Sequence, residues 1–185
     1  MPTIDLPDPA LVVLVGAAGS GKSTFATRNF AADEVLSSDA FRALLTGDER
    51  NQDATRTAFS ILHREVASRL AAGRLVVVDA TNVERHARRA LVARARTAGV
   101  PAVAIVLALP EALVHARNAG RVERVVDAEI VARHLARLAA ASDADTDTIF
   151  PDEGFATVHV LRSEAEVESV AIVRRRSGAS PPSRT

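Results

Sequence analysis

Eight residues near the amino terminus form a glycine-rich loop that ends in a lysine and a serine. The loop is Gly16-Ala17-Ala18-Gly19-Ser20-Gly21-Lys22-Ser23, and it follows the apolar run Leu11–Val15. The pattern G-x-x-x-x-G-K-[ST], between a strand and a helix-forming stretch, is typical of loops whose backbone N–H groups bind phosphates. Lys22 is the only lysine among 23 basic residues, so the other 22 are arginine. A compact ammonium group can bridge β- and γ-phosphate oxygens, which predicts a nucleoside-triphosphate site.

A second group of residues could hold a magnesium ion beside this loop. The apolar run Leu75–Val78 ends in Asp79, and an aspartate at the end of a strand opposite a phosphate-binding loop commonly supports Mg²⁺ or its waters. We expect the Ser23 hydroxyl to ligate the ion directly. The predicted cofactors are therefore ATP and Mg²⁺. The predicted nucleotide-binding residues are Gly16, Gly19, Ser20, Gly21, Lys22, Ser23 and Thr24.

A carboxylate and an arginine follow the next predicted strand. Asp39 and Arg42 are three residues apart at the start of a short helical stretch, so they share one helix face. Asp39 could accept a proton from an attacking hydroxyl, and Arg42 could hold an anionic group of the acceptor. Asp39 could equally cap the helix, because aspartate is a preferred N-cap residue. The spacing of the residues alone supports these two interpretations equally.

Two further arginines and one asparagine are weaker candidates. Arg117 and Arg121 are four residues apart in a helical stretch, where both could neutralise charge on a transferring phosphoryl group. Because arginine is abundant in this chain, spacing alone favours a solvent-exposed helix face instead. Asn82 could contact an acceptor, or it could cap a helix that starts near Val83.

Short β-branched runs alternate with longer amphipathic stretches, which predicts an α/β fold with a parallel β-sheet flanked by helices. The predicted strands are Leu11–Val15, Glu34–Ser37, Leu75–Val78, Ala102–Leu107 and Thr157–Leu161. Apolar residues at helical spacing predict helices between them. One helix packs through Leu91, Ala95 and Ala98, and we place Arg88 largely off that inner stripe.

Length and composition predict one domain. With 185 residues, 48% of them hydrophobic, the chain can build one full core, which we assign to residues 1–173. We expect residues 174–185 to be a disordered basic and Ser-Pro tail in which Arg174–Arg176 form a solvated charge run, and residues 142–148 to be a mobile loop.

Charge and residue usage restrict the function and location of the protein. The net charge of +0 excludes bulk electrostatic coating of nucleic acid, so any such contact should be local. The absence of cysteine excludes disulfides and thiolate chemistry. The first residues lack a basic, apolar leader, and no long uncharged apolar segment occurs, so we expect a cytoplasmic protein without membrane association.

Taken together, these residues resemble a known family, the polynucleotide 5′-hydroxyl kinase module of bacterial RNA end-healing and repair enzymes, which is more distantly related to the phage polynucleotide kinase. The resemblance covers nearly the whole chain to about Val170, in matching order and spacing. The matching segments are Gly19–Ala26, Ser37–Asp39, Leu62-His63 with Arg69-Leu70 and Gly73, Val77–Val83, Leu109–Glu111, Arg117-Asn118 with Arg121, Arg133-His134, and Glu153–Phe155.

The resemblance implies a P-loop phosphotransferase fold and transfer of the ATP γ-phosphate to a 5′-hydroxyl end of RNA or DNA. It implies that Asp39 is the general base, that Arg42 orients the acceptor, and that Arg117 and Arg121 belong to a helical lid over the triphosphate. The family joins this module to phosphatase and ligase domains. Here those activities would come from separate partners, or the module would act on another hydroxyl.

Two other functions stay open. One is a kinase of a small-molecule hydroxyl, on a nucleoside, sugar or antibiotic, which would keep Lys22, Ser23 and Asp39 but enclose its acceptor. The other is an ATP-hydrolysing switch without a phosphoacceptor, in which Asp39 would be dispensable. The chain has six Phe and no Trp or Tyr, so a polynucleotide would be held by its end and its phosphates rather than by extensive stacking.

Overall fold

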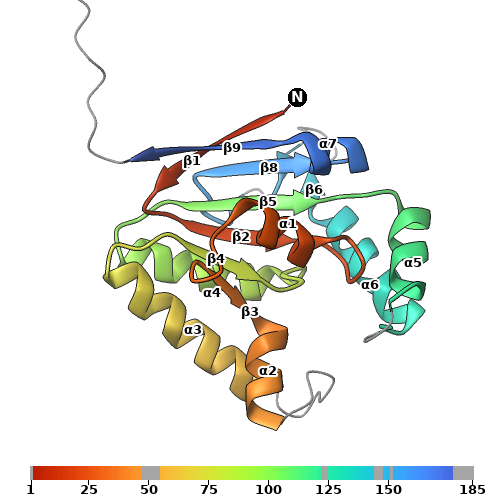
Figure 1. Ribbon diagram of the computed structural model, residues 1–185, viewed down its shortest axis with the longest axis horizontal. Coiled ribbons are helices and arrows are strands. Elements are labelled where there is room, and N and C mark those ends of the chain that lie inside the picture. The colour runs from red at the N-terminus through yellow and green to blue at the C-terminus, as the bar shows by residue number, and fades with distance from the viewer. Residues whose placement is uncertain (1, 47–54, 122–124, 144–147, 151, 177–185) are drawn as a thin grey trace, which may run out of the picture.

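A five-stranded parallel sheet forms the centre of the protein (Figure 1). The computed structural model describes residues 2–46, 55–121, 125–143, 148–150 and 152–176. The strands, in their order across the sheet, are β3 (Val35–Ser37), β4 (Val76–Asp79), β2 (Leu11–Val15), β5 (Ala102–Leu107) and β8 (Thr157–Leu161). All neighbouring strands are parallel, so their carboxyl ends meet at one edge.

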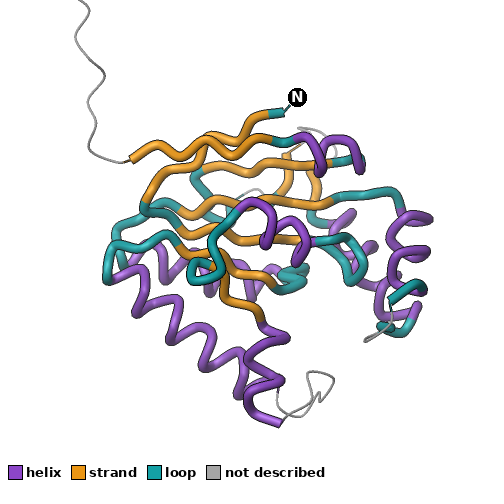
Figure 2. Tube along the Cα trace, viewed as in Figure 1, coloured by secondary structure: helices purple, strands orange, loops and turns teal. Residues whose placement is uncertain are grey.

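Helices cover both faces of this sheet (Figure 2). The helices of the described residues are α1 (Lys22–Asn29), α2 (Ser38–Thr46), α3 (Thr55–Ala71), α4 (Arg85–Thr97), α5 (Glu111–Ala119), α6 (Ala128–Ala140) and α7 (Glu164–Ser169). The predicted α/β class with a parallel sheet flanked by helices is confirmed.

Successive side chains of the central strands enter two different hydrophobic clusters. In β2, Val12 and Leu14 pack with Phe25 of α1, whereas Leu11 and Val13 pack with the α3 and α4 side. Side chains alternate across a strand, so a strand that is covered on both faces must be apolar at every position. This explains why β2, β4 and β5 are apolar runs in the sequence, and why the predicted positions of these strands agree with the structure.

Two terminal strands form a separate ribbon that the sequence analysis missed. β1 (Thr3–Asp8) pairs in parallel with β9 (Ala171–Arg176), and the two strands lie beside each other in Figure 1. Ile4 and Leu6 are buried in the core, while the intervening residues are exposed or half-buried. β9 continues through Arg176, so the predicted tail boundary at residue 174 falls inside a strand. Residues 177–185 lie outside the described part of the chain.

The predicted loop at residues 142–148 also contains backbone pairing. β6 (Ser142–Asp143) and β7 (Thr148–Ile149) form an antiparallel pair, and residues 144–147 between them are outside the described residues. Among the helices in the described ranges, none is long and apolar enough to cross a membrane.

Candidate active site

A cavity of about 530 Å³ opens at the carboxyl edge of the sheet. Its wall combines the glycine-rich loop after β2, the start of α2 after β3, and the segment after β4. Residues between α5 and α6 and the first half of α6 complete it. In an open α/β sheet, ligands bind at this edge where the strand order reverses. Here β2 lies between β4 and β5, which places the loop at such a point.

The glycine-rich loop has a backbone that side chains would disturb. Gly19 and Gly21 both have φ of +89°, in the region that favours glycine. A Cβ atom on Gly19 would lie 2.7 Å from the Val114 carbonyl oxygen of α5. The loop then enters α1, whose first-turn N–H groups have no partner within the helix. This cradle of small residues before a helix N-terminus fits a bound phosphate chain.

Lys22 is buried within its own loop. Its Nζ donates to the carbonyl oxygens of Gly16 and Ala17, at 2.9 and 2.8 Å, and to Ser20 Oγ at 3.4 Å. Burial lowers the pKa of Lys22 to about 8, while nearby Asp79 acts to raise the pKa and Arg121 to lower it. Lys22 lines the cavity together with Ser23, Thr24 and Asp79.

Asp39 and Arg42 line the same cavity as Lys22. They form an ion pair through Arg42 Nη2 and Asp39 Oδ1, so the two side chains share one helix face as predicted. α2 begins at Ser38, so Asp39 lies in the first turn and is not its N-cap. The cavity thus brings a carboxylate, an arginine and the phosphate-binding loop to one space.

Asp79 is the last residue of β4, is almost fully buried, and lines the same cavity as Ser23. One hydroxyl and one carboxylate suit Mg²⁺, which binds proteins through few direct ligands and keeps waters and substrate phosphates in its remaining positions. Within the described residues, no three His, Cys, Asp or Glu side chains gather into a denser metal site. The residues present therefore fit a magnesium ion that arrives with a nucleotide.

Asn82 joins the segment after β4 to the neighbouring strand β2. Its Nδ2 donates to the Leu14 carbonyl oxygen at 2.8 Å, and it is buried outside the cavity lining. The following helix begins at Arg85 with Glu84 as its N-cap, so the alternative that Asn82 caps this helix is wrong.

Arg117 and Arg121 do not share a helix face. α5 ends at Ala119, and the Gly120 N–H closes the helix by donating to Ala116 O at 3.1 Å. Arg121 follows this end and lines the cavity, whereas Arg117 forms an ion pair with Glu164 of α7. Arg117 nevertheless stays beside the loop, because its Nη1 is 3.4 Å from the position of a Cβ on Gly21.

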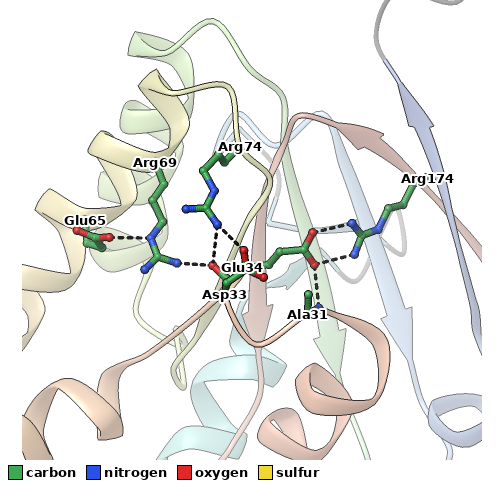
Figure 3. Close-up of polar contacts among 7 residues, drawn as sticks. All are labelled: Ala31, Asp33, Glu34, Glu65, Arg69, Arg74 and Arg174. Carbon is green, nitrogen blue, oxygen red and sulfur yellow. Dashed lines mark hydrogen bonds and ion pairs between the residues drawn. The ribbon is translucent and has the colours of Figure 1, made fainter.

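Ion pairs support the edge strand that leads into Asp39 (Figure 3). The loop before β3 carries Asp33 and Glu34. Arg74 Nη2 donates to Asp33 Oδ2 at 2.6 Å, and Arg174 of β9 contacts Glu34 through two bonds of 2.6 and 2.7 Å. The Arg174 contact lowers the pKa of Glu34. The terminal strand β9 is thereby tied to the strand that presents Asp39.

His134 is a cavity residue to which the sequence analysis assigned no role. It lies in α6 one turn after Ile130, and both side chains line the cavity. Its Nδ1 is buried and has no hydrogen-bond partner among the described residues. Burial and, to a smaller extent, the charges of Lys22 and Arg137 lower the pKa of His134. In the sequence, only the four-residue spacing from Ile130 indicates that His134 lies on the same face of α6.

The prediction for Arg88 is wrong. This side chain is 1% exposed and pairs with Glu153. It is therefore buried, although the spacing of apolar residues in α4 predicts a position largely off the inner stripe. A buried arginine requires a buried partner, and that partner is 65 residues away in the chain.

Comparison with solved structures identifies similar folds. A chain of the Pnkp1/Rnl/Hen1 RNA repair complex has a TM-score of 0.61 at 17% identity, with 94% of this chain and 81% of that chain covered. Kti12 of Chaetomium thermophilum, solved with ADP–AlF3, has a TM-score of 0.58 at 19% identity and coverages of 85% and 93%. Another structure of the Pnkp1/Rnl/Hen1 complex has a TM-score of 0.52 at 26% identity, covering 64% of this chain and 41% of that one.

Sequence comparison identifies the family. Among curated proteins, no sequence matches this chain. A family model described as an AAA domain matches residues 11–144, which include the glycine-rich loop, Asp39, Asp79 and both arginines of the α5 region. With this match over most of the chain, and with the parallel sheet and loop described above, the protein belongs to the AAA domain family and has an α/β P-loop fold.

Proposed function

We propose that this protein transfers the γ-phosphate of ATP to the 5′-hydroxyl end of a polynucleotide. The observation that carries the proposal is the cavity that Asp39 and Arg42 line together with Lys22 and Ser23 of the loop. A switch that only hydrolyses ATP has no need of a carboxylate and an arginine at this place. The similarity to chains of the Pnkp1/Rnl/Hen1 complex, which is described as an RNA repair complex, supports a polynucleotide acceptor.

In the proposed reaction, each cavity residue has a separate task. The loop from Gly16 to Ser23 binds the triphosphate, and Lys22 contacts its β- and γ-phosphates. Magnesium, held by the Ser23 hydroxyl and by Asp79 directly or through water, would supply charge neutralisation at the phosphate oxygens. Arg121 lies where it can neutralise charge that develops on the transferred group, and Arg117 beside Gly21 can reach the same phosphates on leaving Glu164.

The acceptor side of the cavity supplies the proton transfer. Asp39 accepts the proton of the 5′-hydroxyl as the oxygen of that hydroxyl forms a bond to the γ-phosphorus. The bond from the γ-phosphorus to its bridging oxygen breaks, and ADP leaves with the electron pair of that bond. In this proposal Arg42, which is ion-paired with Asp39, orients the acceptor through the phosphate on the 3′ side of its first nucleotide.

The test is phosphate transfer from γ-labelled ATP to matched oligonucleotides. Label should appear on 5′-OH oligonucleotides and not on those that carry a 5′-phosphate and a 3′-OH. Lys22→Ala and Asp39→Asn should each lower transfer by about 10²-fold or more, because both groups act at the reacting atoms. Asp5→Asn, the same change at an exposed residue of β1 outside the cavity, serves as the control. Full activity of Asp39→Asn would exclude Asp39 as the base.

The second candidate function is that of a kinase that phosphorylates a small-molecule hydroxyl. The volume of the cavity supports this candidate. A space of about 530 Å³ is in the range that small ligands occupy. The same assay therefore includes nucleosides, sugars and aminoglycosides as acceptors. Transfer to one of these, with none to 5′-OH oligonucleotides, would reassign the acceptor and leave the kinase assignment intact.

A further inference from the structure

Arg88 makes an unusually complete set of contacts for a buried charged residue. Its Nε and Nη2 donate to the two carboxylate oxygens of Glu153, at 2.7 and 2.6 Å. Its Nη1 donates to the carbonyl oxygens of Asn82 and Val83, at 3.0 and 2.7 Å. The ring of Phe150 covers the guanidinium, with its centroid 3.8 Å from Cζ. The arginine therefore joins a distant carboxylate to the backbone that follows β4.

The same backbone segment is bonded to the phosphate-binding loop on its other side. The Asn82 side chain donates to the carbonyl oxygen of Leu14 in β2, and Gly16 N donates to Thr81 O at 3.0 Å. Asn82 has a φ of +49°, an uncommon backbone conformation outside glycine. A continuous chain of hydrogen bonds thus runs from Glu153 through Arg88 and the Asp79–Asn82 segment to the start of the loop that contains Lys22.

Stability alone does not explain this arrangement. A buried ion pair costs desolvation of both groups, and well-packed apolar residues in its place are often as stable or more stable. Apolar residues cannot supply a planar guanidinium whose Nη1 donates to two backbone carbonyl groups while Nε and Nη2 hold a carboxylate. The segment held in this way carries Asp79 and Thr81, both of which line the cavity.

We propose that the Arg88–Glu153 pair is a positioning device that sets the Asp79–Thr81 wall of the cavity against the phosphate-binding loop. This proposal rests on the proposed phosphotransferase function. Arg88 and Glu153 do not line the cavity, so they act through Asn82, Val83 and Thr81 rather than on the reacting atoms. A displacement of about 1 Å in a group near the reacting atoms can lower a rate by about 10²-fold.

The experiment replaces the pair without leaving a lone buried charge. The variants are Arg88→Met combined with Glu153→Leu, and Arg88→Lys, which keeps the charge but loses the fork. Arg85→Met is the matched control, because Arg85 lies on the same helix, approaches the same carboxylate at 3.9 Å, and is mostly exposed. Amide hydrogen exchange at Gly16 reports the bond to Thr81, and exchange at Val77 and Val103 reports the core.

We expect exchange at Gly16 to be about 10-fold or more faster in both Arg88 variants, with exchange at Val77 and Val103 unchanged. Turnover should fall by about 10- to 100-fold while KM for ATP stays within about threefold, since the loop itself is intact. Arg85→Met should behave as the wild-type protein.

The proposal is overturned if a folded Arg88 variant exchanges the Gly16 amide at a rate within about twofold of the wild-type rate. If the double variant does not fold, Arg88→Lys decides by the same measurement. A wild-type protein that phosphorylates no acceptor would refute the proposed function, whereas the exchange comparison, which needs no acceptor, would still test the positioning role.

Discussion

At the scale of single residues, the phosphate-binding loop depends on the absence of a side chain at Gly19. Two properties act together at this position: a φ of +89° and the close approach of the α5 backbone to the place where a Cβ would stand. Gly73, in the turn after α3, has a φ of +69°, but a Cβ there would have no neighbouring atom within 4 Å. The two glycines therefore separate the effect of backbone conformation from the effect of a steric clash.

We expect Gly73→Ala to lower the free energy of unfolding by roughly 1–2 kcal/mol, the cost of a left-handed conformation for a residue with a Cβ. Gly19→Ala should cost about 1–3 kcal/mol more, because its Cβ also displaces the Val114 carbonyl group. It should also weaken ATP binding, whereas Gly73→Ala should not. Urea unfolding and ATP titration measure both effects. Equal stability losses in the two variants would contradict the steric argument.

At the scale of elements, the edge strand β3 receives support from the opposite end of the chain. β3 pairs only with β4 in the described sheet, and its three residues offer little backbone pairing. Arg174 of β9 and Arg74 after α3 bind the acidic loop that precedes it (Figure 3). The terminal ribbon thus stabilises the strand that leads to Asp39 and Arg42.

The Glu34–Arg174 pair should give a stability contribution that depends on pH. Because the pKa of Glu34 is lowered in the folded protein, its contribution is present above pH 4.5 and is lost as the pH falls through the folded-state pKa. Arg174 is exposed to solvent, so we expect at most about 1 kcal/mol from a double-mutant cycle of Glu34→Gln and Arg174→Met at pH 7. In about 0.15 M salt the coupling should weaken as the pH falls below 4.5 and Glu34 becomes protonated. A coupling that does not weaken with acidification would show a contact of another kind.

At the scale of the whole molecule, three half-buried histidines should make the protein less stable in mild acid. Burial is the main cause that lowers the pKa of His63, His134 and His159, and for His63 the value falls from 6.5 to about 4, with the Arg94 charge as a second cause. Between these two pH values the unfolded chain takes up a proton that the folded protein does not. The free energy of unfolding therefore decreases as the pH falls from 6.5 to 4.

His63→Leu should make this pH dependence less steep, because the unfolded chain then binds one proton fewer in that range. The measurement is urea unfolding at several pH values between neutrality and the folded-state pKa of His63. His86→Leu, at an exposed position of α4, is the control. Its unfolding free energy should depend on pH as steeply as that of the wild-type protein. An unchanged slope in His63→Leu would show that His63 is protonated in the folded state.

The features that depend only on the local pattern of residues could be predicted from the sequence. The three inner strands β2, β4 and β5 follow from apolar runs, because a strand buried on both faces leaves little room for a polar residue. The glycine-rich loop follows from its spacing, because its backbone conformation and phosphate binding are properties of adjacent residues. The roles proposed for Asp39, Arg42, Arg117 and Arg121 remain predictions for the assays above.

Contacts between distant residues emerged from the folded chain alone. β1 and β9 contain a proline and three arginines, and they form strands because their ends of the chain lie side by side. Arg88 is buried because Glu153 and the carbonyl groups after β4 surround it. Asn82 binds Leu14 across the sheet. Such contacts depend on the packing of segments far apart in sequence, and the free energy of burying a charge depends on its partners, which local spacing does not contain.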